Sequence, residues 1–430
     1  MNFRAFSSLN CLFTLIFCLI YSANALSGYR AFLDPRSMAM GGTGVAAANK
    51  FNASAHNPAL IAFIKGNKPD KIYLNVALGT REVYNEDLNS DVIRVKDSGL
   101  IEKYNNTEGS EFIDTGNDLI ALLEDVNHSS YRQDEFESFS LLVDTAPITI
   151  NFFTRKEVRK QSTLLFTDAG IIERNAALTE AEETQFLEPL SSAVHTTAFE
   201  LKELGITVAT TNVIDYNMPI SWGFSPKLIE FNSKHTAARV DDYDINSAAK
   251  ISGSESNLEW NLDVGFAILF TDDFLQNEFG LDGEWLEGEW VFGFSGMNLF
   301  PTDIQSFGPI GEFIEFPKSR PALQALYQIG MAHYREKFMA TLDIELTEDE
   351  VYTFDGLSRF ISFGGEYYWR DDFHLRGGLR VNASQPDGGS KEGATLSAGF
   401  LYQPHGFKIE GAVMVSDIEL GGTMGFGVAF

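Results

Sequence analysis

The second half of the chain alternates apolar and polar residues with a period of two. In residues 258–270 the even positions are bulky and apolar, from Leu258 and Trp260 to Phe270, whereas the odd positions are acidic or small, as at Glu259 and Asp263. The same alternation recurs in residues 338–346, 361–370, 373–381, 395–402 and 407–415. This period is typical of β-strands that have one apolar face. The segments run to about 9–13 residues, a length that suits a tilted strand crossing a bilayer.

The last ten residues continue the pattern to the end of the chain. Gly422, Met424, Phe426, Val428 and Phe430 fall on one face, and small residues fall on the other. Chain ends are usually frayed, because ordering them costs entropy and buries little. A strand that reaches the last residue therefore predicts a neighbouring strand with which it pairs.

The connections between these segments differ in length. Asp371-Asp372 and residues 403–406 are tight turns, whereas residues 271–287, 300–322 and 382–392 are longer and rich in Asp, Glu, Gly and Pro. Short turns at one end and long loops at the other are typical of outer-membrane barrels. A soluble β-sandwich is the alternative. Strand length and aromatic residues near the strand ends favour an all-β, transmembrane, antiparallel up-and-down barrel of about 14 strands, with about 12 or 16 as alternatives.

Two segments and one strand depart from the pattern. Residues 81–135 are polar and acidic with some helical periodicity, and residues 176–192 also predict a helix. We expect both as excursions from a barrel at residues 67–430, on the extracellular side or as a periplasmic subdomain. Within residues 199–208 the apolar residues change from odd to even positions. A strand kink or bulge at Lys202 and Glu203 explains this change, and a turn between two short strands explains it equally well.

The first 25 residues have the features of a secretory signal peptide. Arg4 precedes an apolar stretch, and small residues at Ala23 and Ala25 form a cleavage site. Both cysteines lie inside this segment, so we expect no disulfide and no thiol chemistry in the mature chain. The net charge of −28 excludes nucleic acid as an expected partner.

No motif in the sequence predicts an enzyme, a cofactor or a metal site. Gly42, Gly44 and Ala47 have dinucleotide-like spacing, but no apolar strand precedes them. Residues 242–247 resemble the start of a calcium loop without its glycine or its bidentate glutamate. The seven histidines show no metal-ligand spacing.

The segment SGYRAFLDPRSMAMGGTGVAAANKFNASAHNPALIAF resembles the N-terminal signature of the outer-membrane TraF family, named after plasmid-transfer operons. That family belongs to the wider group of FadL-type, long-chain fatty-acid transporter-like barrels. The resemblance implies that residues 26–66 form a hatch, or plug, inside a 14-stranded barrel. Its motif residues in this chain are Arg36, Met38, Met40, Gly41, Gly42, Gly44, Asn57, Pro58, Ala59 and Leu60. The aromatic terminal strand also resembles the signal for outer-membrane assembly, carried here by Phe426, Val428 and Phe430.

Two functions follow as hypotheses for a Gram-negative outer-membrane protein. The first is a passive, FadL-like channel for a hydrophobic or amphipathic small molecule. The second is a non-transporting surface or assembly barrel, related to conjugation or to envelope structure, whose acidic loops contact partners. The expected partners are outer-membrane lipid and lipopolysaccharide, the barrel-assembly machinery and a hydrophobic ligand. Inward charges such as Asp343 and Arg376 predict a polar, salt-bridged interior.

Overall fold

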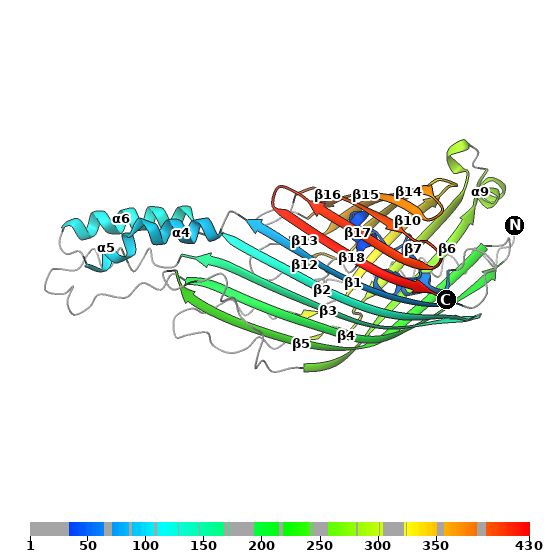
Figure 1. The fold of residues 1–430 in the computed structure, drawn as a ribbon, viewed down its shortest axis with the longest axis horizontal. Coiled ribbons are helices and arrows are strands. Elements are labelled where there is room, and N and C mark those ends of the chain that lie inside the picture. The colour runs from blue at the N-terminus through cyan, green and yellow to red at the C-terminus, as the bar shows by residue number, and fades with distance from the viewer. Residues whose placement is uncertain are drawn as a thin grey trace.

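The fold is a closed barrel of fourteen antiparallel strands (Figure 1). The computed structural model describes residues 34–63, 71–85, 88–106, 110–127, 129–145, 147–166, 172, 193–214, 218–240, 243, 257–280, 283–300, 302–303, 322–323, 325–350, 357–384 and 393–430. The strand order around the barrel is β1-β18-β17-β16-β15-β14-β11-β10-β7-β6-β5-β4-β3-β2. The predicted fold class and the predicted number of strands are therefore confirmed. The signal peptide and the helix expected at residues 176–192 lie outside the described residues.

The barrel strands lengthen from β1 to β5 and are short from β7 onward. Their bounds are β1 Lys71–Asn85, β2 Ser130–Thr145, β3 Ile148–Leu165, β4 Ala193–Ile214, β5 Met218–Arg239, β6 Asn257–Thr271, β7 Glu289–Met297, β10 Leu326–Tyr334, β11 Phe338–Glu345, β14 Phe360–Arg370, β15 Phe373–Asn382, β16 Thr395–Tyr402, β17 Phe407–Val415 and β18 Glu419–Ala429. Two small sheets lie outside the barrel ladder, made of β8 Thr302–Asp303 with β9 Ala322–Leu323 and of β12 Asp349–Glu350 with β13 Leu357–Ser358. The helices are α2 Pro35–Ala39, α3 Ala53–His56, η1 Pro58–Ala62, α4 Leu88–Ser98, α5 Leu100–Asn106, α6 Ser110–Asp125, α9 Asp272–Phe279 and η4 Glu284–Leu286.

The two ends of the barrel differ in their connections. At the short-turn end, strands are joined by residues 146–147, 215–217, 335–337, 371–372 and 403–406. The chain leaves the barrel at Ala429 at this same end, where Phe430 N–H donates to Ile72 O at 2.9 Å. The long-loop end carries α4, α5 and α6 (Figure 1). In outer-membrane barrels the short turns are periplasmic and the long loops are extracellular.

The structure corrects the bounds of one predicted segment and the position of another. The acidic insertion was expected at residues 81–135, but β1 continues to Asn85 and β2 begins at Ser130. Residues 271–287 were grouped with the long loops, whereas the connection from β6 to β7, with α9 and η4, lies at the short-turn end. The length of a connection does not show at which end of the barrel it lies, because a connection at the short-turn end can also fold into helices, as α9 and η4 do.

The outer face of the wall is a continuous apolar surface. Exposed side chains on it include Leu78, Phe152, Leu204, Trp222, Trp260, Phe363, Trp369, Leu396, Val413 and Met424. A surface of this size would be unfavourable in water, whereas lipid tails accommodate it. None of the described helices is long and apolar enough to span a membrane. The strands place the protein in the bacterial outer membrane.

The insertion between β1 and β2 folds around its own apolar core. Leu88, Val92 and Val95 of α4 recur at helical spacing and are buried with Leu119 and Leu123 of α6. Side chains from the tips of β3 and β4, Leu164 and Val194, complete this core. The helical module is thereby anchored to strands that follow it in the sequence.

Strand β4 passes through Lys202 and Glu203 without a bulge or turn. Its register with β3 is unbroken there, with Lys202 opposite Lys156 and Glu203 opposite Arg155. The prediction of a kink at these residues is wrong. From Phe199 to Ala209 the odd residues of β4 face the lumen, and the outer face changes from charged at Lys202 to apolar at Leu204, which is 62% exposed. The apolar residues change parity because Phe199 and Leu201 face the lumen, whereas Leu204, further along the strand, lies on the outer face.

The ladder between β4 and β5 is interrupted a few residues further along, at residues 206 and 207. The register runs from Gly205 opposite Lys227 to Val208 opposite Phe224 and skips the two pairs between them. Pro226 lies in this gap, and proline has no N–H to donate to a ladder. Periodicity placed an irregularity at Lys202 and Glu203. The interruption lies instead beside Pro226 of the neighbouring strand, a proline that the sequence shows.

Candidate functional site

Residues 34–63, here called the N-terminal segment, lie against the lumen face of the barrel (Figure 1). Helix α2 contacts β15, β16, β17 and β18, whereas η1 contacts β3, β4, β5 and β6. Met38, Met40, Ala59 and Ile61 are completely or almost completely buried. Contact with strands all around the barrel means that the segment occupies the lumen. Whether it acts as a hatch that opens stays a prediction.

The backbone of the N-terminal segment rests directly on glycines of the wall. An ideal Cβ on Gly378 would lie 2.1 Å from Gly41 N, and one on Gly293 would lie 2.2 Å from Val45 O. Such distances exclude any side chain at these positions unless the backbone moves. Glycines in the same role are Gly223, Gly265, Gly293, Gly330, Gly364, Gly378 and Gly399. The wall therefore holds the segment by shape.

Asp34 organises the N-terminal segment internally. Its Oδ1 accepts hydrogen bonds from Ser37 N at 2.9 Å and Asn52 Nδ2 at 2.8 Å, and its Oδ2 lies 2.7 Å from His56 Nε2. Burial raises the pKa of Asp34, but His56, Ser37 and Asn52 outweigh burial and hold the pKa below its ordinary value. One carboxylate thus caps α2 and ties it to α3.

A chain of buried ion pairs joins the N-terminal segment to the wall. Arg36 Nη1 donates to Glu366 Oε2 at 2.7 Å, and Arg376 Nε donates to Glu366 Oε1 at 2.9 Å. Arg376 Nη1 reaches Glu410 Oε2 at 2.8 Å, and Glu410 also pairs with Lys408. All five side chains are buried. Charges removed from water are stable only as such a connected set.

Two further side chains hold the segment through its backbone. Asp343 Oδ2 accepts from the N–H groups of Gly44 at 2.6 Å and Val45 at 2.8 Å. Asn57 Oδ1 accepts from Ala59 N at 3.1 Å, and its Nδ2 donates to Phe266 O at 3.0 Å. Asn57 is therefore both the cap of η1 and a link to β6.

Nearer the long-loop end the lumen carries a second charged network. Asp134 pairs with three guanidinium groups, those of Arg81 at 2.6 Å, Arg159 at 2.8 Å and Arg132 at 3.4 Å. Glu419 of β18 then pairs with Arg81 at 3.1 Å and, across the two intervening strands β17 and β16, with Arg380 of β15 at 3.1 Å. The predicted salt-bridged interior is present at this level as well.

Apolar side chains also face the lumen, in two groups. The upper apolar cluster is formed by Phe199, Leu201, Ile229, Phe231 and Leu323 on β4, β5 and β9. The rings of Phe199 and Phe231 lie 5.8 Å apart. The lower apolar cluster is formed by Met38, Ala39, Phe136, Ala412 and Met414. It includes residues of the N-terminal segment, so apolar surface continues from the wall onto that segment.

The other predicted site residues have these positions. Gly41 and Gly42 adopt the left-handed backbone that favours glycine, with φ of 70° and 96°. Pro58 opens η1, and Leu60 is 3% exposed. In the terminal strand, Phe426 is opposite Val76 of β1 and Val428 is opposite Leu74, so the last strand closes the barrel onto the first. The reading of this strand as an assembly signal stays a prediction.

Sequence reasoning missed the partners of the N-terminal segment. Glu366 and Asp343 lie about three hundred residues beyond Arg36 and Gly44, and a single sequence carries no signal for such pairs. Two signals were available. Asp34-Pro35 has the pattern of a helix cap followed by proline, and glycines such as Gly265, Gly293 and Gly378 recur in successive strands where the N-terminal segment lies against the wall.

Comparison with known proteins supports the fold. The family described as "F plasmid transfer operon, TraF, protein" matches residues 54–344. No curated protein matches the sequence. A solved structure titled "TodX deltaS2S3 mutant monoaromatic hydrocarbon channel" has 13% identity and a TM-score of 0.51, covering 94% of this chain and 98% of that chain. The Ralstonia pickettii toluene transporter TbuX has 12% identity, a TM-score of 0.36 and coverage of 94% and 99%. A Pseudomonas aeruginosa FadL homologue has 10% identity, a TM-score of 0.40 and coverage of 94% and 99%. The chain shares the barrel fold of the first of these structures.

Proposed function

The chain belongs to the TraF family of the F plasmid transfer operon, and on this premise we propose that it is a passive outer-membrane channel for hydrophobic or amphipathic small molecules. The observation that carries the proposal is the upper apolar cluster. It faces the lumen at a level where the outer face of the same strands carries Glu200 and Lys202. Apolar side chains on the inner face, opposite charged ones outside, are suited to binding an apolar ligand within the lumen.

The two apolar clusters define the proposed route. A ligand entering at the long-loop end meets the upper cluster first and the lower cluster, with Met38, next. Passage beyond Met38 requires the N-terminal segment to move, which is the hatch role that its sequence resemblance implies. The driving force is the concentration gradient of the ligand. The neighbour titled as a monoaromatic hydrocarbon channel is consistent with this substrate class.

A lateral exit through the barrel wall is an alternative route for a ligand. The skipped pairs beside Pro226 weaken the wall between β4 and β5. On its inner side lie Thr207 and Ser225, whose hydroxyls are 2.8 Å apart, and Ile206 faces lipid. We propose this gap as the point where an apolar ligand could enter the bilayer instead of the periplasm.

The channel is tested by replacing Phe199 and Leu201 together with serine. We expect uptake of the hydrophobic fluorophore 1-N-phenylnaphthylamine across the outer membrane to fall by about tenfold, because each lost side chain removes up to roughly 1.5–3 kcal/mol of apolar contact. The measurement is the rise of fluorescence in cells that contain equal amounts of folded, heat-modifiable protein.

The matched control replaces Glu200 and Lys202 with serine. These residues lie on the same strand segment but face outward, so uptake should stay at the wild-type rate. Equal uptake by all three proteins would refute the channel. Deletion of residues 34–63 should raise uptake, and unchanged uptake after this deletion would refute the hatch.

A surface or assembly function is the second candidate, and the helical module favours it. Residues 88–125 have an apolar core of their own, completed by the strand tips, which a simple channel does not need. We propose that this module contacts an envelope or cell-surface partner, with lipopolysaccharide around the barrel and the barrel-assembly machinery acting on the terminal strand. Replacing residues 88–125 by a short Gly-Ser turn should leave fluorophore uptake intact and abolish partner capture.

A further inference from the structure

Glu157 lies between the two apolar clusters of the lumen. On β3 it is directly opposite Phe136 of β2 and directly opposite Leu201 of β4. All three side chains face the lumen and are less than a tenth exposed. Directly opposed residues on one face place their Cβ atoms about 4.5–5.5 Å apart. Phe136 belongs to the lower cluster and Leu201 to the upper one, so the carboxylate stands on the proposed route.

The basic neighbours of Glu157 on its own strand are engaged elsewhere. Arg155 donates to Glu203 Oε2 at 3.1 Å and to Ser54 O at 2.6 Å. Arg159 donates to Asp134 Oδ1 at 2.8 Å. Glu157 is only 6% exposed, and no described residue donates a hydrogen bond to its Oε2. A buried acceptor without a donor costs free energy, so folded proteins rarely retain one that has no use.

We propose that Glu157 Oε2 accepts a hydrogen bond from the ligand, so that the channel selects apolar molecules that carry one donor, such as a hydroxyl or amino group. The apolar body would lie on Phe199, Leu201 and Phe231, and its donor would reach Glu157. A hydrogen bond to a buried acceptor oxygen adds discrimination that apolar contact alone does not give. This inference rests on the proposed channel function.

The test compares two probes of nearly the same shape, 2-naphthol and 2-methylnaphthalene. Only the first has a donor. Binding is measured by naphthalene fluorescence with the full chain in lipid nanodiscs, for the wild type and for Glu157→Leu. The ratio of wild-type to variant affinity is taken for each probe separately, which cancels partitioning of that probe into lipid. We expect Glu157→Leu to lose about tenfold or more in affinity for 2-naphthol and to bind 2-methylnaphthalene as well as the wild type does.

Two other variants make the test specific. Glu137→Leu removes a carboxylate from the outer face of β2, where Glu137 is exposed and opposite Lys156, and should change neither affinity. Glu157→Gln keeps an uncharged acceptor oxygen and should lose part of the affinity for 2-naphthol. It also keeps the test valid if Glu157→Leu lacks the heat-modifiable folded form.

The outcomes separate this inference from the channel itself. If both probes bind the wild type and Glu157→Leu changes neither or both equally, the oxygen is hydrated and the inference is wrong, while the apolar route stands. If the wild type binds neither probe, the apolar route is refuted and the inference with it. Loss confined to 2-naphthol and to the Glu157 variants supports the inference.

Discussion

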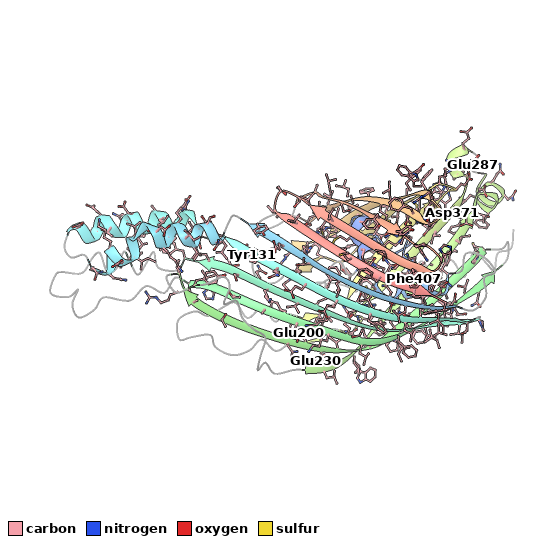
Figure 2. The ribbon with its side chains drawn as sticks, viewed as in Figure 1. Tyr131, Glu200, Glu230, Glu287, Asp371 and Phe407 are labelled. Carbon is pink, nitrogen blue, oxygen red and sulfur yellow. The ribbon has the colours of Figure 1, made fainter. Side chains whose placement is uncertain are left out.

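The lumen has two levels that are built differently. At the level of the N-terminal segment, backbone meets backbone across glycines such as Gly293 and Gly378, and buried ions such as Arg36 and Glu366 join the two. Nearer the long-loop end, the contacts on the lumen face of β4 and β5 are made by side chains, as between the rings of Phe199 and Phe231. Figure 2 shows Glu200 and Glu230 on this part of the wall.

The two levels are suited to different roles, one to closure of the lumen and the other to selectivity. A backbone contact across glycine cannot adapt, because no rotamer is available to absorb a change. A side-chain cluster can repack, and it can differ in polarity from one position to the next. We infer that the lower level closes the lumen and that the upper level recognises what enters it.

Removing the shared carboxylate of the lower level should have the largest effect. Among the described residues, Glu366→Ala leaves Arg36 with its hydrogen bond to Ala47 O at 3.2 Å, whereas Arg376 keeps Glu410. Breaking a buried pair in this way costs about 3–5 kcal/mol. We expect a lower midpoint for loss of the heat-modifiable band and faster proteolysis of the N-terminal segment.

An exposed ion pair from the same pair of strands is the control for that variant. Asp372 lies 3.5 Å from Arg370, and both side chains are well exposed. Such pairs contribute about 0–1 kcal/mol, so Asp372→Ala should keep the wild-type midpoint. If both variants gave the same small shift, the lower level would not be held by its buried ions.

Neighbouring glycines of β15 test the fit of the backbone. A Cβ on Gly378 would lie 2.1 Å from Gly41 N, whereas a Cβ on Gly377 would lie 3.9 Å from its nearest contact, Ser397 O. Overpacking costs about 1–3 kcal/mol, so Gly378→Ala should destabilise the folded protein or displace the segment. Gly377→Ala should do neither. The readouts are the thermal midpoint and the single-channel conductance, which a displaced segment would raise.

Much of the fold could be predicted from the sequence, because a strand that faces lipid on one side must alternate. Leu258, Trp260 and Leu396 carry that signal without help from distant residues. The alternation becomes misleading where the surroundings change along one strand. Lys202 and Leu204 share a face but lie in different surroundings, so the parity change there predicts a kink or a turn, and β4 has neither at these residues.

The site could be predicted only in outline. The N-terminal motif resembles its family closely enough to indicate residues such as Arg36 and Asn57, and Asn57-Pro58 also predicts its own cap. Closure of the barrel supplies their partners, since it brings Glu366 to Arg36 and the carbonyl of Phe266 to Asn57. The upper apolar cluster was missed because Phe199 and Leu201 face inward at odd positions, against the even parity of the apolar residues that follow them.

The smallest expected effect compares the two directions of the exchange between Leu and Met, one direction at each level. Leu201→Met in the upper cluster conserves volume among side chains that can repack, so its cost should be well under about 1.5 kcal/mol. Met40→Leu places a branched side chain at a completely buried position in a cluster with Ala59 and Ile61, beside a backbone that is fixed against Gly364 and Gly378 and so leaves less freedom to repack. We expect the thermal midpoint to fall further for Met40→Leu than for Leu201→Met. Equal midpoints would mean that the lower level repacks as freely as the upper one, and the assignment of closure to the first and recognition to the second would fail.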